Sequence, residues 1–312
     1  MPSRFHAGEL AVQERAGVRE RAAKVGGSIH GALPPAAVAF LEQRRFLVLA
    51  TADHAGRPWT SILTGPPGFA SAPDPLEVRI EGSPLPGDPL ADNLRSGALA
   101  GLLAMDLATR RRMRANGRLQ HAGGRPITIR VDQVYSNCPK YIQRRAVEAG
   151  MPQGAPGPGR RARSLTEAQR AWIRRADSFF IATLHPDAGA DASHRGGMPG
   201  FVSVEGDRLV WPDYAGNMMY NTLGNIAVHP WAGLAVPDFG TGAVLQVTGR
   251  AAVAWDRISV ADVAGAERLV ELVVEDVVEI AGVLPPSPGV PDYSPFNPPV
   301  GRSMPSPGGQ LS

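Results

Sequence analysis

The stretch SHRGGMPGFV at residues 193–202 decides how this chain is read, because residues 61–70 repeat it as SILTGPPGFA. The two stretches lie 132 positions apart and share a serine, two glycines, a proline and a phenylalanine at matching places. Glycine and proline at fixed places mark a tight turn, and apolar residues follow each turn. An internal duplication is therefore the first expectation.

The same offset of 132 extends well beyond these turns. It also relates residues 50–51 to 182–183, residues 100–102 to 232–234, and residues 117–118 to 249–250. Chance matches of glycine and alanine would not keep one offset through a helix, a hairpin and several turns. Late in each copy the register shifts, so that residues 127–135 correspond to residues 268–278.

Each copy has the pattern of a leading helix and about six short strands. Residues 46–51 and 58–63 are apolar runs around a turn, which predicts a hairpin, and residues 76–80 and 127–135 alternate as strands do. Closely spaced antiparallel strands favour a small barrel. The fold class expected is mainly β with short helices, as two tandem six-stranded barrels.

Composition shifts give the expected organisation of the chain. Residues 150–163 are Gly, Pro and Arg with almost no apolar content, which is typical of a linker. Ser164 and Glu167 have capping-box spacing, so a helix should begin there. The expected units are a helical arm at 1–30, a first barrel at 31–149, the linker at 150–163, a second barrel at 164–284 and a Pro/Gly-rich tail at 285–312.

Charge and composition exclude several classes of protein. The net charge is +3, from 32 Lys and Arg against 29 Asp and Glu, and aromatic residues make up 6%, so no nucleic-acid partner is expected. Cys138 is the single cysteine, which excludes an internal disulfide framework, and the seven histidines show no ligand spacing, so no metal is expected. No apolar run of about 18 residues or signal peptide is present, so we expect a cytoplasmic protein without a membrane partner.

The two copies differ most at their shared turn. Where the first copy has Ile62, Leu63 and Thr64, the second has His194, Arg195 and Gly196. Glycines let backbone N–H groups approach a ligand, and a guanidinium offers donors suited to phosphate, so the second copy predicts an anion cradle. The alternative interpretation is a tight Gly-Gly turn with a solvated arginine.

A polar loop at residues 211–222 is the second candidate for a ligand-binding segment. It holds Asp213, Asn217, Asn221 and Thr222 close together, and short amide and hydroxyl groups can recognise a polar ring edge or a hydroxylated chain. The alternative is ordinary turn chemistry, since Asn and Asp favour turns.

Two basic segments are the third candidate for a ligand-binding region. Residues 110–114 are interpreted as a solvated hairpin, whereas Lys140, Arg144 and Arg145 leave the first barrel and can reach towards the second. The spacing of Lys140 and Arg144 predicts one side of a helical turn, facing an anionic cofactor or substrate. The alternative is that they solvate the exit of the barrel. Cys138 has no His-Asp arrangement beside it, so no catalytic residue is assigned.

Several of these segments together resemble a known family, the pyridoxamine 5′-phosphate oxidase-like, FMN-binding split-barrel proteins, and most of all its tandem flavin-nucleotide-binding members. The segments that carry the resemblance are residues 5–9 with Gln13, and residues 112–118, 137–145, 177–183, 193–202, 212–225 and 245–250.

The resemblance implies a six-stranded split barrel per copy and an FMN at a barrel–barrel interface. Two fused barrels would supply that interface as an intrachain pseudo-dimer, and the chain would also be able to form a further homodimer. Arg195 stands where the family places its phosphate-binding arginine, whereas the first copy has Leu63 and the family's usual basic pair is here Asn217-Met218. The expected cofactor-binding residues are Ser193, His194, Arg195, Gly196, Gly197, Pro212, Asp213, Asn217, Asn221, Thr222 and Gln246, with Lys140, Arg144 and Arg145 for substrate.

The function expected from the resemblance is that of an FMN-dependent oxidoreductase acting on a small substrate or electron donor. A flavin carries the redox chemistry itself, so no acid–base pair needs to be visible in the sequence. The alternative is a non-enzymatic flavin or haem carrier on the same fold.

Overall fold

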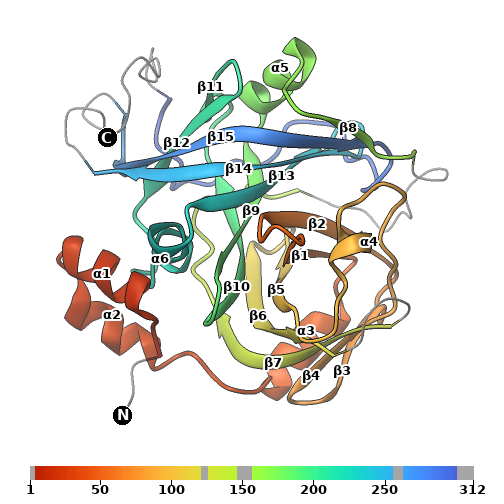
Figure 1. Cartoon of the computed structure of the whole chain (residues 1–312), viewed down its shortest axis with the longest axis vertical. Helices are drawn as coiled ribbons and strands as arrows, with labels where there is room; N and C mark the ends of the chain where they lie inside the picture. The colour runs from red at the N-terminus through yellow and green to blue at the C-terminus, as the bar shows by residue number, and fades with distance from the viewer. Residues whose placement is uncertain (1–3, 121–125, 146–156, 256–262, 301–312) are drawn as a thin grey trace.

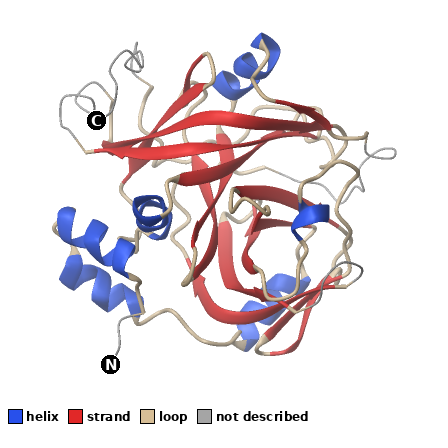
Figure 2. Cartoon of the chain, viewed as in Figure 1, coloured by secondary structure: helices blue, strands red, loops and turns tan. Residues whose placement is uncertain are grey.

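The computed structural model of the chain describes residues 4–120, 126–145, 157–255 and 263–300. Strands dominate it and the helices are short (Figure 2). The strands form two antiparallel sheets, one from each copy, which match two tandem split barrels (Figure 1). The mainly β fold class expected from the sequence is thus confirmed.

The two sheets have the same strand order. The first runs β2-β1-β5-β6-β7-β4-β3 and the second runs β10-β9-β13-β14-β15-β12-β11. Each path holds seven strands rather than six, because the residues after each glycine turn form a short extra strand, β3 or β11. The bounds are β1 Phe46–Ala52, β2 Pro58–Thr64, β3 Ala70–Asp74, β4 Glu77–Ile80, β5 Leu99–Asp106, β6 Arg111–Leu119, β7 Ile127–Ser136, β9 Ser178–His185, β10 Gly189–Gly196, β11 Ser203–Glu205, β12 Arg208–Tyr214, β13 Trp231–Asp238, β14 Ala243–Ala254 and β15 Ala266–Ile280.

The duplication is visible in the register of the strands. Strands β5 and β13 keep the offset of 132 along their whole length. Met113 pairs with Ser136, and its counterpart Leu245 pairs with Glu279. The offset between β7 and β15, the last strands of the two copies in chain order, is therefore 143 residues. Both sheets carry a β-bulge at the equivalent glycine, Gly117 or Gly249.

The two sheets pack directly on each other, and a pair of equivalent glycines allows the close approach. A Cβ on Gly101 would lie 2.8 Å from the carbonyl oxygen of Ala190, and a Cβ on Gly233 would lie 2.3 Å from that of Pro58. Around this contact lies an apolar cluster with members from both copies, among them Phe46, Trp59, Ile62, Phe180 and Val244. Burial of this surface stabilises the contact between the copies.

Six helices are present in the described parts of the chain. Helices α3 (Pro35–Glu42) and α5 (Glu167–Arg175) precede the first strand of each sheet, and α4 (Leu90–Asn93) and α6 (Asn221–Val228) follow the fourth. Helices α1 (Ala7–Arg15) and α2 (Arg19–Gly26) form the arm beside α6 (Figure 1). No helix among these is long and apolar enough to cross a bilayer.

The start of α5 differs from the expectation. The capping box is Thr166 with Gln169, not Ser164 with Glu167, because Thr166 has the extended backbone of an N-cap and its side chain accepts from the Gln169 N–H. Glu167 is instead an exposed first-turn residue that pairs with Arg170 and Arg174.

The expected linker and tail lie only partly within the described residues. Residues 150–156 and 301–312 lie outside them. At the end of the linker, β8 (Arg160–Ala162) adds to the second sheet by pairing with β15. In the tail, Ser294 and Asn297 hydrogen-bond Gln143, and Asp292 pairs with Arg144.

Candidate functional site

A pocket of about 100 Å³ lies between the two copies and opens to solvent. The second copy supplies the end of β10, the end of β12 and the loop that leads into α6, while the first copy supplies β6 and the segment after β7. The residues that line it are Arg112, Arg114, Cys138, Lys140, Tyr141, Ser193, His194, Arg195, Gly196, Phe201, Pro212, Asp213, Tyr214, Gly216, Asn217, Met218, Tyr220, Asn221, Thr222 and Leu223.

Strand β10 brings a neutral imidazole and a guanidinium to the buried floor of the pocket. Burial, with Arg112 and Arg195 nearby, lowers the pKa of His194 well below its ordinary value, so the ring is neutral. Arg195 donates to the carbonyl oxygen of its neighbour His194 at 3.1 Å, and burial also lowers the pKa of Arg195. Burial therefore disfavours the charged form of both side chains.

Strand β6 adds two more guanidinium groups from the first copy. Arg112 and Arg114 lie two residues apart, so they share one face of the strand. Arg112 donates to the carbonyl oxygen of Cys138 at 2.8 Å, and burial together with Arg114 and Arg195 lowers the pKa of Arg112 to about 9. Burial opposes the charge of Arg114 as well, but Asp191, at 3.0 Å, keeps the pKa of Arg114 above its ordinary value.

The positive charges of the pocket outnumber the negative ones. Arg114 is paired with Asp191, and Asp213 is paired with Arg268 at 3.1 Å. Within the described parts of the chain, the other three cations of the pocket form no ion pair; they are Arg112, Arg195 and Lys140. Asp213 favours the charged form of Arg195 from a longer distance. Partly buried cations that outnumber the nearby carboxylates suit a bound anion.

Three buried nitrogen atoms of the lining residues support the same conclusion. The Nε of Arg112, the Nε of Arg114 and the Nε2 of His194 have no hydrogen-bond partner among the described residues. The Nδ1 of His194 lies 3.4 Å from an Arg112 nitrogen, which can only donate, so Nε2 carries the ring proton. All three nitrogens are donors, and donors without acceptors fit phosphate oxygens.

The beginning of α6 forms another wall of the pocket. Asn221, Thr222 and Leu223 line it from the first turn of the helix, and no side chain caps this end. The N-terminus of a helix carries partial positive charge, which favours an anion. The loop before it is strained, since Met218 and Tyr220 have φ of 63° and 59°, and such conformations persist where surrounding contacts fix them.

The rim of the pocket is aromatic and more exposed than the floor. The rings of Tyr141 and Tyr214 lie 5.1 Å apart, and the Tyr141 hydroxyl donates to the carbonyl oxygen of Ala215 at 3.0 Å. Lys140 and the exposed Cys138 lie beside them. The pocket thus combines a cationic floor with flat apolar surfaces at its mouth.

The structure brings most of the sequence-predicted residues together here. Ser193 donates to Asp191 at 2.8 Å and its hydroxyl lies 3.2 Å from that of Thr222, and Asn217 accepts from the Met219 N–H at 3.0 Å. The predicted residues that line the pocket are Ser193, His194, Arg195, Gly196, Pro212, Asp213, Asn217, Asn221, Thr222 and Lys140.

Four predicted residues lie elsewhere. Gly197 packs against Phe201 behind the turn, where a Cβ would lie 2.6 Å from that ring. Arg144 forms an ion pair with Asp292, and Arg145 pairs with Asp177, so neither is turned towards the pocket. No helical turn places Lys140 and Arg144 on one side, because Arg144 bridges to the tail in an extended conformation.

Gln246 also lies outside the pocket. Its amide nitrogen donates to the carbonyl oxygen of Thr60 at 2.9 Å and lies 3.3 Å from Asp88. This is the place in the first copy that corresponds to the pocket in the second. The sequence reasoning assigned Gln246 to the cofactor from its segment alone, whereas its strand faces the opposite copy.

The sequence does not assign Arg112 and Arg114 to the site, because residues 110–114 have the pattern of a solvated hairpin. The difference between the copies is nevertheless a signal, since the counterparts of Arg112 and Arg114 at the offset of 132 are Val244 and Gln246. At all three arginine positions of the pocket, Arg195 included, one copy has an arginine and the other does not. Tyr141 and Tyr214, at the rim, carried no comparable signal.

Comparisons with solved structures give low identities over part of the chain. A putative pyridoxamine 5′-phosphate oxidase from Lactobacillus delbrueckii is 16% identical, covers 37% of this chain and 98% of its own, and has a TM-score of 0.30. A FAD-binding protein from Mesorhizobium loti is 14% identical, with 39% and 96% covered and a TM-score of 0.28. HupZ from Group A Streptococcus is 12% identical, with 40% and 99% covered and a TM-score of 0.29.

A family model matches the second half of the chain, whereas no curated protein matches the chain. Residues 165–288 match the family model described as pyridoxamine 5′-phosphate oxidase, and this segment contains β9 to β15 and the β10, β12 and α6 walls of the pocket. This match confirms, for residues 165–288, the resemblance to the pyridoxamine 5′-phosphate oxidase-like split-barrel family that the sequence indicated.

Proposed function

We propose that the chain binds one FMN in the pocket between its two copies and is an FMN-dependent oxidoreductase. The observation that carries the proposal is the convergence of Arg112, Arg114 and Arg195, from both copies, on one floor, where Arg114 alone of the three forms an ion pair with a described carboxylate. A terminal phosphate would accept hydrogen bonds from these groups and from neutral His194. The tyrosines of the rim offer flat surfaces suited to the isoalloxazine ring.

The roles of the chain's own residues follow from this arrangement. The flavin, when bound, would supply hydride or electron transfer. Arg112, Arg114 and Arg195 would bind and orient it through its phosphate, and the packed copies would exclude water from the floor. Lys140 at the rim, half-buried beside Tyr141, favours a small substrate that carries a negative charge.

Flavin fits the pocket better than haem does. A histidine that ligates iron through Nε2 needs its proton on Nδ1, but the Nδ1 of His194 faces a guanidinium donor. The protonated Nε2 is suited to donate to an oxygen of phosphate. A non-enzymatic flavin carrier differs from the oxidoreductase in turnover alone and is the remaining alternative.

Binding and spectra of the purified protein test the proposal. With FMN bound, the protein should absorb near roughly 370 and 450 nm, and titration should saturate at one FMN per chain. Riboflavin, which lacks the phosphate, should bind at least about 30-fold more weakly, because charge-assisted hydrogen bonds contribute roughly 1.5–3 kcal/mol each. Equal affinity for the two, tighter binding of FAD, a Soret band or two FMN per chain would overturn it.

A further inference from the structure

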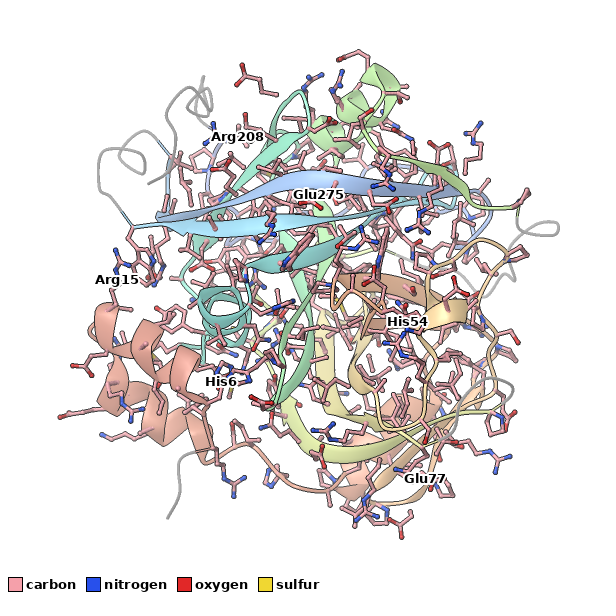
Figure 3. All side chains as sticks on the ribbon, in the orientation of Figure 1. His6, Arg15, His54, Glu77, Arg208 and Glu275 are labelled. Atoms are coloured by element: carbon pink, nitrogen blue, oxygen red, sulfur yellow. The ribbon has the colours of Figure 1, made fainter. Side chains whose placement is uncertain are left out.

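The amino-terminal residues 5–9 and Gln13 contribute to the family resemblance but have no part in the pocket's lining. In the structure they contact residues 219–225, of which residues 220–223 line the pocket at the start of α6. The His6 Nε2 lies 2.9 Å from the Asn225 Oδ1, and Gln13 donates to the carbonyl oxygen of Met219 at 3.1 Å. Figure 3 shows His6 on the side of α1 that faces the two sheets.

Helices α1 and α6 are in close contact because each has a glycine at the crossing. A Cβ on Gly8 would lie 2.3 Å from the carbonyl oxygen of Gly224, and a Cβ on Gly224 would lie 2.6 Å from the backbone nitrogen of Glu9. No other residue fits either position without a shift of backbone. The arm is therefore fixed against α6 rather than loosely attached.

Glu9 connects this contact to the floor of the pocket. Its carboxylate accepts from the Asn221 Nδ2 at 2.5 Å, while the Asn221 Oδ1 lies 3.4 Å from an Arg114 nitrogen. Asn221 thus has one end of its amide on Glu9 and the other on Arg114, which fixes the direction of the amide. Arg114 in turn pairs with Asp191.

The groups that face Glu9 come from four elements. His6 lies 3.6 Å away at the start of α1, but burial, with His185 nearby, lowers the pKa of His6 to about 4, so it is a neutral neighbour rather than an ion-pair partner. Asp191 of β10, Arg114 of β6 and Tyr135 of β7 are the other titratable groups of the network, and Arg4 and Asp132 line the same small pocket as Glu9. Glu9 is 5% exposed, and charges interact more strongly in a buried environment than in water, so the ionisation of Glu9 affects the other groups of this network.

We propose that α1 is a positioning element of the anion pocket, in which Glu9 orients Asn221 towards Arg114 and Gln13 fixes the strained segment between Met218 and Tyr220. This inference rests on the proposed FMN site and adds to it a residue that touches neither FMN nor substrate. The two positive-φ residues flank Met219, whose carbonyl oxygen is the acceptor for Gln13. Removal of either contact should loosen the α6 wall and weaken binding of FMN.

Two measurements on the full-length chain test the proposal. In the absence of ligand, Glu9→Ala and Gln13→Ala should speed amide hydrogen exchange in residues 219–225 at least about tenfold. The matched control is Glu14→Ala, since Glu14 is exposed on the same helix. In FMN titrations Glu9→Ala should bind about tenfold more weakly than wild type and the control.

The pH dependence separates a positioning role from general loss of structure. Wild type should lose FMN affinity relative to Glu9→Gln as the pH rises through about 7, where burial sets the Glu9 pKa, because ionised Glu9 adds negative charge near Arg114. The comparison removes the titration of the phosphate itself. Wild-type exchange and wild-type FMN affinity in Glu9→Ala and Gln13→Ala, or parallel pH profiles, would overturn this inference. A wild-type chain that binds no FMN would instead overturn the proposed function, and the exchange result would still test the arm.

Discussion

Arg114 and Gln246 occupy equivalent positions on β6 and β14, and each donates to a buried carboxylate at the opposite copy. Arg114 bonds Asp191 at 3.0 Å beside an open pocket, whereas Gln246 lies 3.3 Å from Asp88 in a closed core. Around Gln246 the other counterparts of the cationic floor are apolar, since Val244 and Ile62 belong to the interface cluster. The place in the first copy that corresponds to the cationic pocket of the second is therefore occupied by an amide and apolar side chains.

The first prediction uses this asymmetry. Arg195→Ala should weaken FMN by about 2 kcal/mol or more, which is roughly 30-fold in Kd, because it removes charge-assisted hydrogen bonds to the phosphate. Fluorescence or calorimetric titration with FMN measures the change.

The matched control is Leu63→Ala, at the equivalent position of the first copy. Leu63 is 2% exposed within the core of its own barrel, so this variant should lose stability, by about 2–5 kcal/mol, but keep its FMN affinity while folded. Equal losses of FMN affinity at both positions would contradict the assignment of one site to the second copy.

The second prediction concerns the rim. Lys140→Ala should retain FMN but raise KM for an anionic acceptor, and the salt dependence of kcat/KM should become shallower, because the variant removes a half-buried cation beside the mouth. Arg144→Ala is the control, since Arg144 is exposed and paired with Asp292 away from the pocket. If Lys140→Ala purifies without flavin, the lysine serves the cofactor instead, and if both variants equal wild type, it serves neither.

Much of the fold was predictable because it follows from local pattern and from the duplication. Apolar runs such as residues 46–51 and the glycine turns at Gly65 and Gly197 fixed the strands and their offset. Finer features depend on tertiary contacts. Beside the N-cap at Thr166, the Leu165 N–H donates to the Asp207 carboxylate, which is distant in sequence. The pairing of residues 160–162 with β15 likewise depends on a strand more than 100 residues away.

The residues of the site that lie on one segment of the chain were predictable from the sequence, whereas those that join the site through packing of the two copies were not. Ser193 to Gly196 form one strand end, so their sequence sufficed. Arg112 and Arg114 join them only through the packing of β6 beside β10, which no local pattern shows. Conversely, Arg145 is basic and close in sequence to Lys140, but its pairing with Asp177 removes it from the pocket.

The third prediction tests the contact between the copies. Gly233→Ala should lower the free energy of unfolding by about 2 kcal/mol or more, because the new Cβ would lie 2.3 Å from the Pro58 carbonyl oxygen and would force the two sheets apart. It should also weaken FMN, since both sheets line the pocket. Gly31→Ala is the control, because nothing lies within 4 Å of a Cβ there, and its stability should change by no more than about 0.5 kcal/mol. Denaturant melts that fail to separate the two variants would contradict a tight contact.

The fourth prediction is a pH dependence of stability that comes from Glu9. Burial, opposed by the His6 N–H and the Asn221 amide, raises the pKa of Glu9 to about 7, above the value near 4.5 expected in the unfolded chain. The folded state therefore binds more protons between these two values, so this group's contribution to stability is complete below about pH 4.5 and is lost as the pH rises through 7. Glu9→Gln cannot titrate, so its free energy of unfolding should rise relative to wild type by up to about 3 kcal/mol between pH 4.5 and pH 8. Urea titrations across this range measure the difference, and Glu14→Gln, at an exposed position of the same helix, should run parallel to wild type. A constant difference between Glu9→Gln and wild type across this range would show that folding does not raise the pKa of Glu9 and would contradict the prediction.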